Sequence, residues 1–207
     1  PTGKRSLWVF ESISYCRHRH GADAVGPYVI TSPTGPDDLL SVLLLARWAD
    51  GVDRRTGDVP IDVAPLFETE SELQQCGQIM TELFQSPAYQ QHLIGRRNHQ
   101  FVMLGYAASA KQTGSVTSKW SLRQAQEALL SAAQAARVDL TIFHGRGSTS
   151  SRNSSMIEAL TRSMPPGAVR GRIRMTEQGE ALHDKYALRP IALRVFEQAF
   201  NALSLSR

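Results

Sequence analysis

Short apolar segments alternate along the chain with longer segments of helical periodicity. The apolar segments lie at 27–31, 61–67, 101–106 and 139–145, and a weaker one lies at 171–176. Each is a continuous apolar run without strict polar alternation, which is typical of parallel strands that are covered on both faces. The pattern therefore predicts about five buried, parallel strands.

The segments between them have helical spacing and several helix start signals. Asp37 and Asp38 follow Pro36, and acidic residues favour the N-terminus of a helix. Thr69 precedes Glu72 by three positions, the spacing of a capping box. We expect helices over 37–50, 69–86, 116–137, 153–163 and 190–204, with a charged, exposed connection at 50–60.

Strands that alternate with helices at this spacing predict an α/β fold with parallel strands and helices outside them. We expect one helix-rich domain over residues 1–207. About five strands are visible, whereas eight close a barrel. The sheet is therefore either open or part of a barrel that extends beyond this chain.

Composition narrows the class of protein. The 207 residues are 42% hydrophobic, and no stretch is long and apolar enough to cross a bilayer. We expect a cytoplasmic protein with no membrane association. The net charge of +4 is spread along the chain, which favours small anionic substrates over a nucleic-acid surface. We interpret Cys16 and Cys76 as reduced, His18 and His20 as exposed, and Trp8, Trp48 and Trp120 as packing residues.

Candidate chemistry gathers where the predicted strands end. Parallel α/β proteins build their sites at the carboxyl ends of their strands. The residues that follow or end these strands supply a carboxylate, an amine, an imidazole and two guanidinium groups: Glu68, Lys111, His144, Arg146 and Arg152. We expect these side chains to surround one anionic ligand.

Each residue type suits a role in anion chemistry. Arg146 and Arg152 can bind carboxylate or phosphate oxygens bidentately, and Gly145 and Gly147 let the backbone approach an anion closely. His144 can move a proton near neutral pH, and Lys111 can neutralise a developing oxyanion. Glu68 can hold a hard cation such as magnesium. The alternatives are a simple turn at the glycine loop, a structural histidine, and a glutamate that only favours a helix N-terminus.

Several segments, in order, resemble the phosphoenolpyruvate carboxylase family. VAPLFET at 63–69 resembles its metal-glutamate segment, and GYAASAKQTG at 105–114 resembles its GYSDSAKDAG-type segment. FHGRGSTSSRNSS at 143–155 resembles its glycine loop, and MPPGAVRGRIRMTEQGE at 164–180 resembles its QPPG…TEQGE stretch. Residues 28–49 are similar to the segment before the metal glutamate. The resemblance covers nearly the whole chain.

This resemblance implies a partial (β/α)8-type barrel. It also implies a lyase of carbon dioxide fixation, which supplies the tricarboxylic acid cycle by converting phosphoenolpyruvate and bicarbonate to oxaloacetate and phosphate. By resemblance Glu68 is a ligand of Mg²⁺ or Mn²⁺, and Lys111, His144 and Arg152 are catalytic. Arg146 contacts phosphate within the Gly145–Gly147 loop. The implied partners are an aspartate or malate inhibitor and either a homo-oligomer or the rest of a larger carboxylase chain.

The chain also departs from the family pattern. Ala108 stands where the family has a second metal-ligand aspartate, Gln112 replaces another aspartate, and serine or asparagine replaces glycines at 148, 151, 153 and 154. Early barrel segments and C-terminal inhibitor-binding helices are lacking. We therefore expect weak or no activity from the isolated chain. The alternative is a non-catalytic module that binds phosphoenolpyruvate or a dicarboxylate.

Overall fold

A computed structural model describes residues 2–49, 52–53, 55–145, 156–177 and 179–206. Its centre is a parallel sheet whose strands neighbour one another in chain order, β1-β2-β3-β4-β5. The strands are β1 (Tyr28–Thr31), β2 (Val63–Phe67), β3 (His99–Gly105), β4 (Asp139–Gly145) and the short β5 (Arg174–Met175). This confirms the predicted α/β class, and the sequential parallel order is consistent with a partial barrel.

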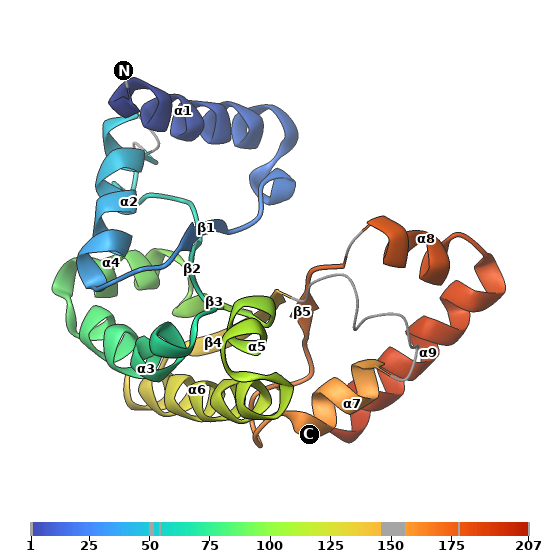
Figure 1. The fold of residues 1–207 in the computed structure, drawn as a ribbon. Coiled ribbons are helices and arrows are strands. Elements are labelled where there is room, and N and C mark those ends of the chain that lie inside the picture. Colours follow the sequence, from blue (N-terminus) through green and yellow to red (C-terminus); the bar gives the residue numbers. More distant parts are fainter. Residues whose placement is uncertain (1, 50–51, 54, 146–155, 178, 207) are drawn as a thin grey trace.

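Helices connect the strands. They are α1 (Thr2–His20), α2 (Pro36–Trp48), α3 (Glu70–Gln85), α4 (Pro87–Gly95), α5 (Ala107–Thr113), α6 (Ser115–Ala135), α7 (Met156–Ser163), α8 (Gly179–Tyr186) and α9 (Arg189–Leu205), with a short 3₁₀ turn η1 (Ala22–Ala24). In Figure 1 the sheet lies between α1 and α2 at one end of the molecule and α7, α8 and α9 at the other.

The two faces of the sheet differ in burial. Val102 and Leu104 of β3, and Leu140 and Ile142 of β4, are buried in the hydrophobic core that the sheet shares with the helices. We call this the helix-facing side. Residues of the opposite parity, such as Phe101 and Phe143, are only half-buried. We call this the inner face, because it corresponds to the interior of a barrel.

Close helix packing supports the helix-facing side. Gly77 of α3 lies against α6, where an added Cβ would come within 2.7 Å of the Cβ of Ala128. Cys76, next to it, is fully buried, and burial raises the pKa of its thiol to about 12. Both cysteines are free, as the sequence predicted.

The predicted strands are all present, with bounds that differ by a few residues. Four helices, α1, α4, α5 and α8, were not predicted. The prediction that the tryptophans are packing residues was wrong, because Trp8, Trp48 and Trp120 are 69%, 68% and 63% exposed. Within the described residues, no helix combines the length and hydropathy that a membrane span requires.

Candidate active site

Glu68 lies at the point where β2 ends and α3 begins. Thr69 is the N-cap of α3 and forms a capping box with Glu72, as predicted. The Glu72 carboxylate accepts hydrogen bonds from the backbone N–H groups of Glu68 (2.8 Å) and Thr69 (3.2 Å). Burial raises the pKa of Glu72, but these hydrogen bonds outweigh burial and hold the pKa below its usual value. Glu72 therefore fixes the backbone from which the Glu68 side chain projects.

The Glu68 side chain covers Gly105 at the end of β3. A Cβ added to Gly105 would lie 2.4 Å from the Cβ of Glu68 and 3.0 Å from its Oε2. Met103 pairs with Leu66 and Leu104 with Phe67 in the sheet, so Glu68 and Gly105 both project to the inner face. Glycine at position 105 is what lets the carboxylate lie across the neighbouring strand.

Lys111 belongs to α5, which hydrogen bonds anchor to the β2–α3 junction. The backbone N–H of Ser109 donates to the carbonyl of Glu68 (3.0 Å), and the backbone N–H of Glu70 donates to Gln112 Oε1 (3.1 Å). Lys111 itself is exposed and forms no ion pair with another described residue. The structure thus links the helix of Lys111 directly to the segment of Glu68.

Gln112 shows how one departure from the family pattern is accommodated. Its amide oxygen accepts from a backbone N–H in the first turn of α3, a position where the orphan N–H groups need acceptors. The neutral side chain fills this role next to Glu68 and Glu72 without adding a negative charge.

His144 is the penultimate residue of β4 and is 1% exposed. Its ring Nδ1 lies 2.7 Å from the hydroxyl oxygen of Tyr106, the residue that follows β3. The carbonyl of His144 accepts from the backbone N–H of Thr176 at 2.9 Å, just after β5. Tyr106 was not singled out as a functional residue from the sequence, although its position at the end of the predicted strand 101–106 was a usable signal.

Gly145 ends β4 and pairs with Gly105 in the sheet. Arg146, Gly147 and Arg152 lie outside the described residues. Of the predicted set, the structure therefore brings Glu68 to the carboxyl end of β2 and His144 and Gly145 to that of β4, with Lys111 on the helix that follows β3, the strand between them.

The described residues do not by themselves form a metal site. They contain no group of three or more His, Cys, Asp or Glu side chains arranged to hold a metal. Glu68 offers one carboxylate, and the methyl group of Ala108 cannot coordinate a cation. Magnesium usually takes one or two protein carboxylates together with substrate oxygens and water. A single carboxylate falls short of the pair that the resemblance implies, so no chemical step is assigned to a metal here.

The amino ends of the strands carry a second polar region. Arg96 pairs with Asp62 at 2.7 Å, and Arg172 pairs with Asp139 at 2.5 Å. The Arg174 guanidinium lies 5.1 Å from the ring centre of Phe101 and 5.0 Å from that of Phe143, a cation–π arrangement on the inner face. Except for Phe143, these groups line a cavity of about 1120 Å³.

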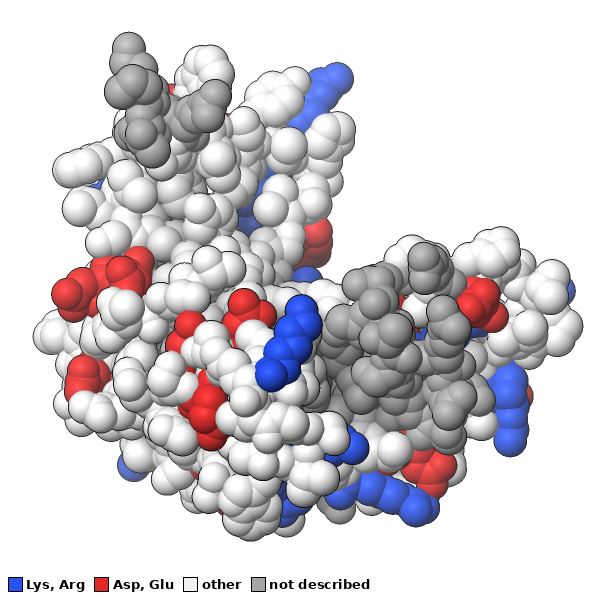
Figure 2. Space-filling model, viewed as in Figure 1, with Lys and Arg blue, Asp and Glu red and all other residues white. Residues whose placement is uncertain are grey.

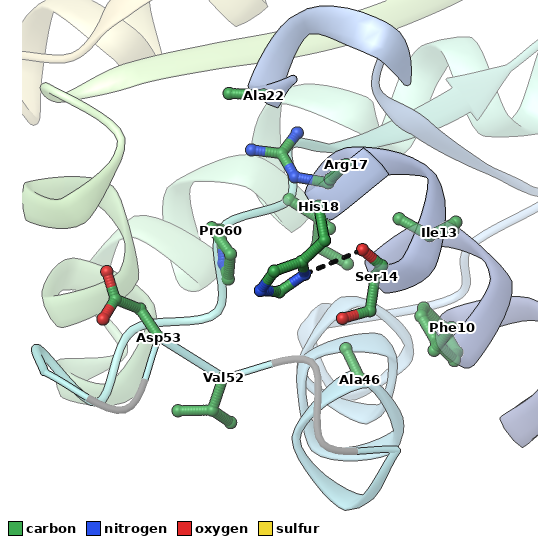
Figure 3. A pocket seen from close by; sticks show the side chains of 11 residues that line it. Phe10, Ile13, Ser14, Arg17, His18, Ala22, Ala46, Val52, Asp53 and Pro60 are labelled. Atoms are coloured by element: carbon green, nitrogen blue, oxygen red, sulfur yellow. Dashed lines mark hydrogen bonds between the residues drawn. The ribbon is translucent and has the colours of Figure 1, made fainter. Parts of the chain in front are cut away.

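A separate cavity of about 580 Å³ lies between α1, α2 and the segment before β2 (Figure 3). Phe10, Ile13, Ala46 and Ile61 contribute apolar lining, and none of the predicted site residues lines it. His18 borders this cavity and is exposed, as predicted, and its Nδ1 lies 3.0 Å from the carbonyl of Ser14. His20 is exposed, as predicted.

Charged side chains are dispersed over the visible surface. On the face in Figure 2, Lys and Arg lie scattered among Asp and Glu rather than in one basic patch. That face does not resemble a nucleic-acid interface, which concentrates its positive charge.

Parallel strands in sequential order, with helices on one face and polar groups at their carboxyl ends, define an α/β protein and are consistent with part of a (β/α) barrel. The family model of phosphoenolpyruvate carboxylase matches residues 1–206. The chain belongs to the phosphoenolpyruvate carboxylase family.

Relatives named phosphoenolpyruvate carboxylase are similar over almost the whole chain. The relative from Xanthomonas oryzae pv. oryzae (strain MAFF 311018) is 44% identical over 198 residues, which cover 96% of this chain and 22% of the relative. Those from Shewanella sediminis (strain HAW-EB3) and Synechococcus sp. (strain WH7803) are 40% and 37% identical, covering 93% and 98% of this chain. The chain thus spans about a fifth of the length of these relatives.

Proposed function

We propose that this chain is the part of a phosphoenolpyruvate carboxylase domain that carries the carboxyl-end site. The reaction converts phosphoenolpyruvate and bicarbonate to oxaloacetate and phosphate. The observation that supports it best is the Glu68 carboxylate, which lies across Gly105 on the inner face beside the helix of Lys111. The ammonium group of Lys111 suits a substrate that carries phosphate and carboxylate groups, whereas the Glu68 carboxylate would face such anions through a bound cation.

The proposed roles follow the chemistry of each group. Arg146, with the backbone of Gly145 and Gly147, binds the phosphate, and Arg152 binds the substrate carboxylate. Bicarbonate oxygen attacks phosphorus, which forms carboxyphosphate and the enolate of pyruvate. Lys111 neutralises the enolate oxygen, and His144 accepts the proton when carboxyphosphate releases carbon dioxide. The enolate carbon then attacks carbon dioxide to give oxaloacetate.

We propose that the isolated chain is a weak catalyst or inactive. A divalent cation, Mg²⁺ or Mn²⁺, would supply stabilisation of the enolate, and Glu68 is the described carboxylate that would hold it. Ala108 removes the second carboxylate, and losing such electrostatic stabilisation costs on the order of several kcal/mol of barrier. The remaining barrel segments of a full-length relative lie beyond the 207 residues.

Oxaloacetate formation tests this proposal. The chain, its Ala108→Asp variant and its Glu68→Gln variant are assayed with phosphoenolpyruvate, bicarbonate and magnesium. We expect Ala108→Asp to raise turnover or metal affinity, and Glu68→Gln to lower both. Robust magnesium-dependent turnover by the unaltered chain contradicts the proposed weakness. Unchanged phosphoenolpyruvate binding in Glu68→Gln, Lys111→Ala and Arg146→Ala alike contradicts the proposed site.

A non-catalytic anion-binding module is the second candidate. It is favoured by Ala108 and by the exposed Lys111, which is unpaired among the described residues. Titration calorimetry with phosphoenolpyruvate, aspartate and malate, each with and without magnesium, separates the two candidates. Metal-independent binding without turnover supports the module, and absence of binding contradicts it.

We further propose that residues 1–207 form one domain that associates with copies of itself or with the rest of a carboxylase chain in the cytoplasm, and that it binds neither nucleic acid nor membrane. Large apolar side chains on α9 support the association, since Phe196, Phe200 and Leu205 are 59%, 74% and 73% exposed. Size-exclusion chromatography tests it, and a monomer at high concentration contradicts self-association.

A further inference from the structure

His144 does not project to the same side of the sheet as Glu68. Leu104 pairs with His144 across β3 and β4, and Leu104 is fully buried on the helix-facing side. Ile142, two residues before His144 on the same strand, is buried there too. Side chains two positions apart on a strand share a face, so the His144 imidazole also lies on the helix-facing side.

Glu68, Gly105 and Gly145 lie on the opposite, inner face. Gly105 pairs with Gly145, and the Glu68 carboxylate rests over the space that a Gly105 side chain would fill. A ligand held against Glu68 is therefore separated from the His144 ring by the ends of β3 and β4. The ligand and the His144 ring therefore lie on opposite faces, and a proton can pass between them only around the end of the strands.

Tyr106 stands at that edge. It directly follows Gly105, it is half-buried, and its hydroxyl oxygen lies 2.7 Å from His144 Nδ1, the distance of a strong hydrogen bond. The rings pack with their centroids 6.0 Å apart. Tyr106 thus reaches from the carboxyl end of β3 to a histidine that is 1% exposed.

We propose that Tyr106 is the residue that touches the substrate and that it relays a proton to His144 behind it. The inference rests on the proposed carboxylase function, because it concerns the proton that leaves carboxyphosphate. His144 acts through Tyr106 and is in this sense a positioning residue.

The relay balances in protons and electrons. The carboxyl proton of carboxyphosphate passes to the Tyr106 oxygen while the Tyr106 hydroxyl proton passes to His144 Nδ1. The bond between the carboxyl carbon and the bridging oxygen breaks, its electron pair stays on the phosphate oxygen, and carbon dioxide leaves. This proton relay requires His144 to be neutral with its Nδ1 unprotonated, so that the Tyr106 hydroxyl donates the hydrogen bond and His144 Nδ1 accepts it.

The fold holds the acceptor in place. The backbone N–H of Thr176 donates to the carbonyl of His144, and Met175 pairs with His144 across β4 and β5. The end of β4 is therefore fixed between two strands, which holds the backbone of His144 in place.

Nitrogen-15 NMR of the histidine rings in the 207-residue chain tests the relay. We expect the unaltered chain to show His144 with an unprotonated, hydrogen-bonded Nδ1 and a protonated Nε2. Tyr106→Phe should remove the hydrogen-bond shift at Nδ1 and change the tautomer ratio, while Tyr15→Phe, a control on exposed α1, should leave His144 unchanged. A purely structural role for Tyr106 does not by itself fix which ring nitrogen carries the proton.

Two results overturn the relay. The first is the observation that His144 carries its proton on Nδ1 in the unaltered chain. This observation does not depend on whether Tyr106→Phe folds. The other is a His144 spectrum that is the same in folded Tyr106→Phe as in the unaltered chain. Phosphoenolpyruvate binding is measured on the same samples by calorimetry, and its absence counts against the proposed function whichever tautomer is found.

Discussion

The charged residues at the two ends of the parallel strands differ in their ion pairing. At the amino ends, Arg96 pairs with Asp62 and Arg172 with Asp139. At the carboxyl ends of β2 and β3, Glu68 and the nearby Lys111 form no ion pair with any other described residue. Charges that are satisfied within the protein stabilise or orient the fold, whereas charges left without partners are available to a ligand. The charged residues at the amino ends therefore stabilise the fold, and those at the carboxyl ends are the ones available for binding.

The largest expected effect concerns acid stability and His92, a buried residue near the amino end. Burial, followed by the nearby charge of Arg96, lowers the pKa of His92 to about 4 from 6.5, although Asp62 and Asp58 oppose this. The unfolded chain therefore binds a proton at pH values where the folded chain does not. The contribution of His92 lowers the free energy of unfolding by about 3 kcal/mol as pH drops from 6.5 to 4. Above pH 6.5 His92 does not change the pH dependence of stability.

Urea unfolding at pH 7, 5 and 4 measures this loss. His92→Gln should flatten the dependence of unfolding free energy on pH in that interval, with the carboxylates of both proteins contributing equally. Parallel curves for the variant and the unaltered chain contradict the assignment. Because the effect lies at the amino end, phosphoenolpyruvate binding by the folded variant at pH 7 should stay unchanged.

The second effect concerns Gly105→Ala at the carboxyl end. The added methyl group would lie 2.4 Å from the Cβ of Glu68, so that residue and its backbone must shift. We expect a loss of about 2 kcal/mol in unfolding free energy and a roughly tenfold loss of phosphoenolpyruvate affinity.

Gly26→Ala is its matched control at the amino end. There the added Cβ meets a flexible terminal nitrogen of Arg174 at 3.0 Å, which can move aside. Stability should change by about 0.5 kcal/mol or less, with affinity unaltered. Equal losses of affinity in both alanine variants contradict the division between the two ends.

The third effect concerns Arg96→Met. It removes the partner of Asp62, and both side chains are about three-quarters buried, with 23% and 24% exposed. We expect a loss of about 1–2 kcal/mol in thermal or urea unfolding, because a partly buried carboxylate is left unpaired. Anion binding measured by calorimetry should not change. A loss of phosphoenolpyruvate affinity in the folded variant would place binding at the amino end instead.

The smallest effect on stability concerns Lys111→Ala. The side chain is exposed and unpaired among the described residues, so unfolding free energy should change by no more than about 0.5 kcal/mol. Affinity for phosphoenolpyruvate should fall several-fold and lose part of its salt dependence. Lys119→Ala on α6, also exposed, serves as the control. An identical, small change in both variants removes Lys111 from the site.

The strands and the strand-end site were predictable because continuous apolar runs end at recognisable polar residues. The short helices α4, α5 and α8 escaped prediction because each is too brief to show a clear helical period. The orientation of His144 was also hidden. Residues 140–143 are mostly apolar at consecutive positions, so the sequence of β4 does not reveal which face is which.

The exposure of the three tryptophans was not predictable from the sequence either. Large aromatic residues are usually buried, yet Trp8, Trp48 and Trp120 lie on outward surfaces of α1, α2 and α6. The longer relatives contain further segments, and the sequence of one helix does not reveal which of its faces such segments cover and which face meets solvent.

The strand order has a consequence for how the protein is made. Among the described strands, each pairs with the one before it in the chain, β1 with β2 through to β4 with β5, and none pairs with a strand from the far end of the sequence. Such pairings form faster than pairings between the two ends of a chain, because less loop-closure entropy is lost. As the polypeptide leaves the ribosome, each new strand can add to an edge that already exists, so the sheet can grow during translation from the N-terminal side.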